Sequence, residues 1–204
     1  MYDEDYFEHG EKNGVSLYTD YRWLPELTIP MAARMLEYLS IRDTDTVLDF
    51  GCAKGFLVYA MRLLGREAYG YDISKYAWAH AHPPVAARIH NDLDLTFDHP
   101  CDWVVCKDVL EHVEKADLVP LLSQLRSTIS RGFFVVPLGD GKRYCIPDYE
   151  KDATHVIREP MEWWAEQFAA AGYTSLVFSY DVPGIKDKWV QVHPEGNGFF
   201  TVGR

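Results

Sequence analysis

An acidic residue followed by a glycine bend is the feature of this sequence that most clearly indicates chemistry. Residues 47–55, Val-Leu-Asp-Phe-Gly-Cys-Ala-Lys-Gly, join an apolar stretch typical of a strand to an apolar stretch typical of a helix. Ligands of open α/β sheets bind at the carboxyl ends of strands, where such bends lie. Glycine also lets the backbone approach a ligand closely. We therefore expect a cofactor to be bound here by Asp49, Phe50, Gly51, Cys52 and Gly55.

Two classes of ligand use a bend of this kind, and its spacing distinguishes them. A dinucleotide site uses G-x-G-x-x-G to seat a pyrophosphate on a helix N-terminus. Gly51, Ala53 and Phe56 occupy those three positions, so two of the glycines are missing. The carboxylate of Asp49 would also repel a phosphate, whereas it suits a ligand that carries an ammonium and a sulfonium. An NAD-dependent oxidoreductase is therefore the alternative, and a cationic cofactor is the prediction.

The bend resembles the first motif of the class I (Rossmann-like) SAM-dependent methyltransferases, which is an acid followed by glycines at G-x-G-x-G spacing. Asp49, Gly51 and Gly55 match this motif, and Ala53 departs from it. The resemblance covers residues 41–137 and implies S-adenosylmethionine (SAM) as the cofactor.

The same resemblance implies roles for residues that follow the next strand candidates. Asp72 ends the second candidate, where nucleoside-binding families place an acid that accepts the ribose hydroxyls. Ile73 would flank the adenine, and Asp92, followed by Leu93, would accept a hydrogen bond from the adenine amino group. Asn-Asp also reads as a turn, which is the other interpretation of Asp92. Lys107 begins the run Lys-Asp-Val-Leu-Glu-His-Val, which resembles the stretch that lines the methionine arm in many small-molecule methyltransferases.

Two histidines are candidates for the base that a hydroxyl acceptor requires. Free histidine has a pKa of about 6.5, which suits proton transfer near neutral pH. His155 is the first candidate, because it lies in the long segment 138–159 that follows the fifth strand candidate, and such loops are often functional. His112, which follows the fourth, is the second. The alternative is that both histidines simply face solvent.

The elements that must position these residues alternate along the chain. Helices are expected over 30–39, 56–64, 75–80, 118–129 and 160–171, and strands over 46–50, 68–71, 87–90, 102–107, 132–137, 173–180 and 198–202. This order predicts an α/β fold with helices on both faces of one doubly wound, mostly parallel seven-stranded sheet. The last two strands follow each other with no expected helix between them, so a hairpin would add one antiparallel strand at the sheet edge. Residues 1–40 are expected to form a helical, aromatic lid extension, and residues 41–204 the SAM-binding domain.

The composition restricts the classes of partner and the cellular location that we expect. The chain has 204 residues, with 20 basic against 31 acidic residues and a net charge of -11, which disfavours nucleic acid. No apolar run reaches the roughly 18 residues of a membrane helix, and no signal peptide is recognisable, so a soluble, cytoplasmic protein is expected. The four cysteines form no C-x-x-C pair, and the histidines are dispersed, so no metal is predicted. The oligomeric state stays open.

The acceptor is predicted to be a small molecule. Methyltransferases of nucleobase or amide nitrogen often carry Asn/Asp-Pro-Pro-Tyr/Phe after the fourth strand, and this chain has Lys-Asp-Val-Leu there. The closest resemblance is to enzymes that methylate sugars or other metabolites, so a hydroxyl is the expected target. Aromatic side chains could stack on a sugar, namely those of Tyr144, Tyr149, Trp163 and Trp164. A non-catalytic scaffold that keeps the SAM fold is the second alternative.

Overall fold

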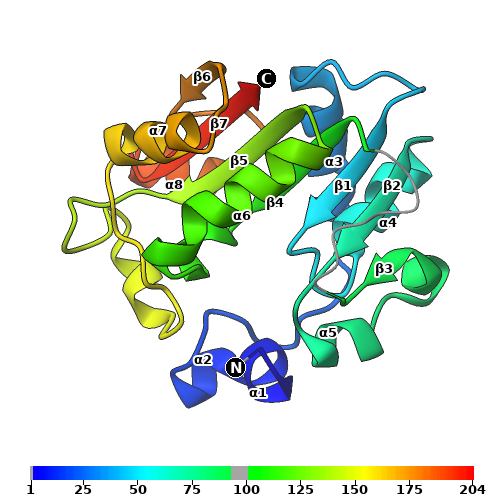
Figure 1. Cartoon of the computed structure of the whole chain (residues 1–204). Helices are drawn as coiled ribbons and strands as arrows, with labels where there is room; N and C mark the ends of the chain where they lie inside the picture. Colours follow the sequence, from blue (N-terminus) through cyan, green and yellow to red (C-terminus); the bar gives the residue numbers. More distant parts are fainter. Residues whose placement is uncertain (1, 93–100) are drawn as a thin grey trace.

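One seven-stranded sheet organises the protein. The structure is a computed structural model that describes residues 2–92 and 101–204. The strands lie in the order β3-β2-β1-β4-β5-β7-β6 (Figure 1). Their bounds are β1 (Thr46–Phe50), β2 (Glu67–Tyr71), β3 (Ile89–His90), β4 (Trp103–Lys107), β5 (Arg131–Pro137), β6 (Ser175–Ser179) and β7 (Asn197–Gly203). Strands β1 to β5 pair in parallel, and β7 pairs antiparallel with both β5 and β6. The predicted mostly parallel sheet is confirmed.

Helices and short 3-10 turns connect the strands. The helices are α1 (Glu4–Glu8), α2 (Gly10–Asn13), α3 (Pro25–Tyr38), α4 (Phe56–Leu63), α5 (Lys75–Ala79), α6 (Lys115–Thr128), α7 (Met161–Ala170) and α8 (Asp187–Val192). The turns are η1 (Pro83–Arg88), η2 (Leu110–His112) and η3 (Pro147–Lys151). Among the described residues, none of the helices combines the length and the apolarity that crossing a membrane requires.

The core consists of two apolar layers, one on each face of the sheet. Successive strand residues point to opposite faces, and in β1 Leu48 packs with α6 and α7 whereas Val47 packs with α3 and α4. Figure 1 shows these two pairs of helices on either side of the sheet. The predicted covering of both faces is confirmed, and the period of two places Asp49 on the same face as Val47.

The carboxyl-terminal part differs from the prediction in two respects. A helix, α8, lies between the last two strands, although none was expected there. It buries none of its residues, so it leaves no apolar periodicity in the sequence. In addition, β7 lies inside the sheet and β6 forms the edge. The reason is that Phe199 and Phe200 of β7 fill the two opposite core layers, whereas Leu176 and Val177 of β6 are exposed.

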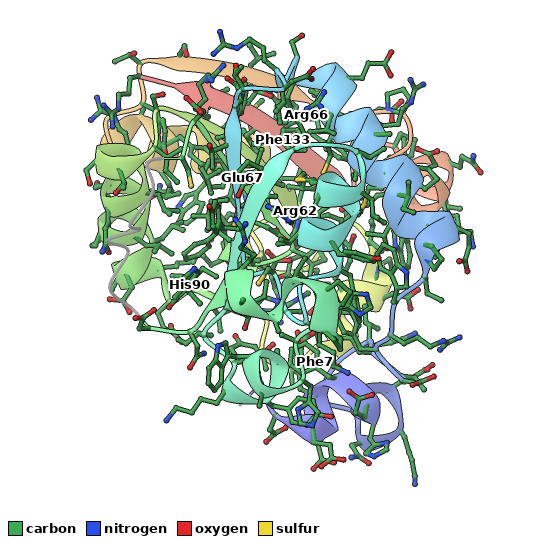
Figure 2. All side chains as sticks on the ribbon, turned by 90° about the vertical axis from the view of Figure 1, so that its right-hand side faces the viewer. Phe7, Arg62, Arg66, Glu67, His90 and Phe133 are labelled. Carbon is green, nitrogen blue, oxygen red and sulfur yellow. The ribbon has the colours of Figure 1, made fainter. Side chains whose placement is uncertain are left out.

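The N-terminal region divides into a covering segment and a core helix. The helices α1 and α2 lie beyond the carboxyl ends of the parallel strands, at the bottom of Figure 1. Figure 2 shows Phe7 of α1 at this end of the molecule and Arg66 at the opposite end. Helix α3 instead places Ala32, Met35 and Leu36 in the core layer shared with α4. We call residues 2–24 the N-terminal cover.

Candidate active site

The bend after β1 has positive backbone φ angles, which favour glycine. Gly51 and Gly55 have φ values of 83° and 81°, and Ala53 between them has φ 49°. A Cβ atom at position 51 would lie 2.2 Å from Cγ2 of Val109, which follows β4. Gly51 is therefore required both for its conformation and for its close contact. Ala53, which departs from the family motif, still adopts the left-handed conformation, and its amide donates a hydrogen bond to Asp72.

Asp72 joins the ends of β1 and β2. Its two carboxylate oxygens accept hydrogen bonds from the amides of Ala53 (2.6 Å) and Ser74 (2.8 Å). The hydroxyl of Ser74 in turn accepts from the amide of Ala77 and so caps α5. Burial raises the pKa of Asp72, which these two hydrogen bonds oppose. The acid is thus held rigidly, and each of its oxygens keeps a second lone pair for a ligand.

A cavity of about 430 Å³ opens where β1, β2 and β4 end. Its size is within the usual range for small-ligand sites. The lining comes from the strand ends, from the start of α6 and from the N-terminal cover, and comprises Tyr2, Tyr6, Phe7, Tyr18, Phe50, Gly51, Ala53, Tyr71, Asp72, Ile73, Asp108, Val109, His112, Val113, Glu114, Asp117 and Leu121. Of the residues predicted to bind the cofactor, Phe50, Gly51, Asp72 and Ile73 line this cavity.

Asp49 lies behind the cavity wall, on the sheet face that carries α3 and α4. Asp49 is 4% exposed. Burial, together with the charge of Asp72, raises the pKa of Asp49 to about 7, against the opposing influence of Lys107. Lys107 supplies one positive charge near this pair of acids, and a second one, from a ligand, would be favourable. The two carboxylates and the glycine contact therefore fit the cationic, adenosyl-bearing cofactor.

The other predicted cofactor residues do not line the cavity. Cys52 packs in the core layer of α3 and α4, and Gly55 precedes α4, where a Cβ atom would lie 2.7 Å from Ile89. Lys107 pairs with its neighbour Asp108, and Asp92 is exposed. Leu93 lies outside the described residues.

His112 lies in the cavity wall and belongs to a hydrogen-bonded relay. Its Nδ1 atom is 2.8 Å from Oγ1 of Thr154, and that hydroxyl donates to Oδ1 of Asp152 at 2.5 Å. Because the threonine proton is directed to Asp152, Nδ1 of His112 must carry a proton and donate it. Its Nε2 atom is then unprotonated. Burial, together with His155, lowers the pKa of His112 to about 4, so the imidazole is neutral at pH 7.

His155 meets His112 although 42 residues separate them in the chain. The two rings lie 4.6 Å apart in an edge-to-face arrangement. The Nε2 atom of His155 is 3.9 Å from Oε1 of Glu111 and 3.8 Å from Oδ2 of Asp152. Burial lowers the pKa of His155. The prediction of no metal depended on the wide spacing of the histidines in the sequence. In the folded protein, however, His112 and His155 are neighbours.

Comparison with known proteins identifies the family. A model of the methyltransferase domain matches residues 22–178, which is most of the chain. The chain belongs to this methyltransferase family. No curated protein sequence matches the methyltransferase, so its relationships beyond the family model come from structure.

Solved structures share the fold of the methyltransferase at low sequence identity. One is a SAM-dependent methyltransferase from Archaeoglobus fulgidus, with a TM-score of 0.65 and 17% identity over 85% of this chain and 92% of that chain. The 1,6-didemethyltoxoflavin-N1-methyltransferase of Burkholderia thailandensis has a TM-score of 0.60 and 16% identity, covering 86% and 76%. Phosphoethanolamine N-methyltransferase 2 of Haemonchus contortus, solved with SAM, has a TM-score of 0.63 and 15% identity, covering 85% and 52%. The predicted class I fold and SAM as cofactor are confirmed.

Charged residues of the methyltransferase that the sequence did not single out also meet near the cavity. Asp108 has φ 58° and lies between the ammonium groups of Lys107 and Lys186. Burial opposes its ionisation, but the two ammonium groups outweigh burial and hold the pKa of Asp108 below the usual range. Asp108 stands in the recognised run after β4, whereas nothing in the sequence indicates that Lys186, from the region of α8, reaches this point.

The N-terminal cover of the methyltransferase is tied to the sheet by polar contacts. Lys54 donates to Oε1 of Glu8 at 2.5 Å and to the carbonyl oxygen of Tyr21 at 2.9 Å. The hydroxyl of Tyr76 donates to the same Glu8 oxygen at 3.1 Å. On the other side, the hydroxyl of Tyr6 donates to Asp152. The crowding of aromatic residues before position 24 was the visible sign of this cover.

Proposed function

We propose that this methyltransferase transfers the methyl group of SAM to a hydroxyl of a small metabolite, such as a sugar. The observation that carries the proposal is the position of His112, which faces the donor cavity in neutral form with one nitrogen unprotonated. A neutral imidazole beside the donor is suited to accepting a hydrogen bond from an acceptor hydroxyl.

Residues at the strand ends would hold the donor. Asp72 would accept hydrogen bonds from the ribose hydroxyls through its remaining lone pairs, and Ile73 would flank the adenine. Gly51 would lie against the positively charged end, and Asp49, behind the Gly51 turn, would act on it through its charge. Asp92, which follows β3, is proposed to accept a hydrogen bond from the adenine amino group. When bound, SAM supplies an electrophilic methyl group on a sulfonium.

The shape of the site supports a small acceptor. The N-terminal cover closes the cavity with four aromatic side chains, which are those of Tyr2, Tyr6, Phe7 and Tyr18. Such a wall excludes water and offers flat apolar surfaces to a sugar or a ring. A macromolecular acceptor would first have to displace the contacts of Glu8 and Tyr6 that hold this cover.

Replacing His155 tests the activation of the acceptor separately from donor binding. His155→Ala should leave the affinity for SAM unchanged, because this residue does not line the donor cavity. Turnover should fall by up to about 10²–10⁴-fold, the usual contribution of an acid or base, because the ring of His155 contacts that of His112 and positions it. The assay would follow radiolabelled methyl transfer into fractionated metabolite extracts.

The exposed His80 provides the matched control for this experiment. His80→Ala should retain both donor affinity and turnover. Equal turnover in His155→Ala and His80→Ala would remove His155 from the mechanism. Tight SAM binding without transfer into any extract would instead favour the scaffold alternative.

A further inference from the structure

We propose that Glu111, His112 and His155 bind a divalent transition-metal ion at the wall of the donor cavity. Each residue can offer one ligand atom, and these three atoms all lie within 4.8 Å of one another. Two imidazoles and a carboxylate are a donor set that Zn²⁺, Mn²⁺ and Fe²⁺ accept and that Mg²⁺ and Ca²⁺ generally do not. Binding of the ion does not depend on the proposed function, but its role in catalysis does.

Unpartnered polar atoms point to a ligand at this place. Glu111 is 1% exposed, and its Oε2 atom has no hydrogen-bond partner within the part of the chain that the structure describes. In His155, which is 7% exposed, Nε2 is the ring nitrogen that approaches Glu111 and Asp152, and Nδ1 has no hydrogen-bond partner among the described residues. Buried polar atoms without partners are rare, and binding of an ion is one of their standard explanations.

The hydrogen-bonded relay prepares His112 as a ligand. Metal-binding histidines usually donate their second N–H group to an oxygen, which fixes the tautomer and the ring orientation. His112 donates from Nδ1 to Thr154, and Thr154 donates to Asp152. The relay therefore leaves Nε2 of His112 with a lone pair that an ion can use.

The positively charged side chains near Glu111 are paired with another carboxylate, so a cation could bind at Glu111. The ammonium groups of Lys107 and Lys186 both pair with Asp108, and Lys186 also donates to Tyr149. Across residues 2–92 and 101–204, no ion pair joins Glu111 to a lysine or an arginine. Glu111 and Asp152 thus converge on His155 without a paired positive charge.

The distances require only a small closure of the three side chains. Bonds of about 2.0–2.2 Å to a zinc ion place neighbouring ligand atoms about 3–3.5 Å apart. Nε2 of His155 is 3.9 Å from the Glu111 oxygen and 3.8 Å from Oδ2 of Asp152. Asp152 could therefore supply a fourth ligand atom, or it could remain only the hydrogen-bond acceptor of Thr154. Small rotations of the side chains are sufficient to reach bonding distances.

The ion would act on the acceptor. His112 lines the donor cavity, so an ion on this residue could also ligate an acceptor hydroxyl inside it. A divalent ion lowers the pKa of an oxygen that it binds. The hydroxyl proton would be released to solvent, and the two histidines would serve as ligands rather than as bases. This deepens the proposed function by making the bound ion, rather than the imidazole of His112, the group that activates the acceptor hydroxyl.

Direct titration of the full chain with Zn²⁺ or Mn²⁺ tests the site. The protein is first treated with chelator and desalted, and binding is then measured by calorimetry, with Mg²⁺ as the comparison. We expect one saturable site for Zn²⁺ and Mn²⁺. Glu111→Gln and His155→Ala should each weaken it by more than the about 10–100-fold that is typical when only the hydrogen-bond partners of metal ligands are removed. His80→Ala should not change it.

Separate readouts distinguish the possible failures. Pulsed electron paramagnetic resonance of Mn²⁺ bound to the unaltered protein should show coupling to imidazole nitrogen, so the test does not depend on the folding of any variant. No saturable binding, no nitrogen coupling, or equal affinity in all variants would overturn the metal site. SAM affinity is measured on the same samples, and its absence would overturn the proposed function instead.

Discussion

The carboxyl group of Asp49 is buried close to that of Asp72, and its pKa is raised to about 7 by burial and then by the second acid. The unfolded chain has a pKa of about 3.9 at this position, so the folded state binds the proton more tightly. Stability from this group is complete below about pH 4 and is lost as the pH rises through 7. Asp49→Asn should therefore stabilise the donor-free protein at pH 8, by up to about 4 kcal/mol, and weaken SAM binding.

Urea unfolding at pH 5 and pH 8 measures this effect. The difference in unfolding free energy between the two pH values should be smaller in Asp49→Asn than in the original protein. If the two proteins showed the same pH dependence, Asp49 would not be the buried, proton-binding group that the structure indicates.

Gly51 and Gly65 allow backbone strain to be separated from close contact. Their φ values, 83° and 78°, are similar. A Cβ atom at Gly51 would lie 2.2 Å from Val109, whereas one at Gly65 would meet nothing within 4 Å. Gly65→Ala should cost about 1–2 kcal/mol from conformation alone. Gly51→Ala should cost more and should reduce SAM affinity, as calorimetry and chemical unfolding would show; equal losses would mean that the contact is unimportant.

At the scale of elements, the sequence predicts whatever is encoded in a contiguous stretch. Strands β1, β4 and β5 contain apolar runs, and the cofactor bend is complete within nine residues, so both could be predicted. Helix α8 could not, because it buries no side chain. Likewise, Glu111 and His155 meet only because the segment after β5 folds back, where the amides of Val156 and Ile157 donate to the Glu111 carbonyl oxygen. No local pattern records such a contact.

The N-terminal cover should loosen when the ion pair between Lys54 and Glu8 is removed. This pair is mostly buried, with side-chain exposures of 12% and 17%, so solvent screens it less than a surface pair. Lys54→Met should accelerate amide hydrogen exchange in residues 2–21 and raise the Kd for SAM about 3–10-fold, with little change in the exchange of β4 and β5.

Arg22 provides the control, because its ion pair with Asp20 is 60% and 67% exposed. Surface pairs of this kind contribute about 0–1 kcal/mol. Arg22→Met should therefore match the original protein in exchange and in affinity. Identical exchange in the Lys54 and Arg22 variants would show that the ion pair does not hold the cover in place.

At the scale of the whole molecule, the cavity lies between the sheet and the N-terminal cover, so a donor that fills it contacts both and should stabilise the fold as a unit. A ligand that binds only the native state adds about 2.7 kcal/mol at 100 times its Kd. For a domain of this length, that corresponds to an increase in Tm of about 5–10 °C. SAM should produce this shift in a thermal unfolding scan, whereas NAD should produce none, because the bend lacks two dinucleotide glycines and the cavity has the carboxylate of Asp72 in its wall and that of Asp49 behind it. A larger shift with NAD than with SAM would mean that the charge of the cavity has been assigned to the wrong ligand. A shift with both would mean that Asp49 and Asp72 do not discriminate between a cation and a pyrophosphate.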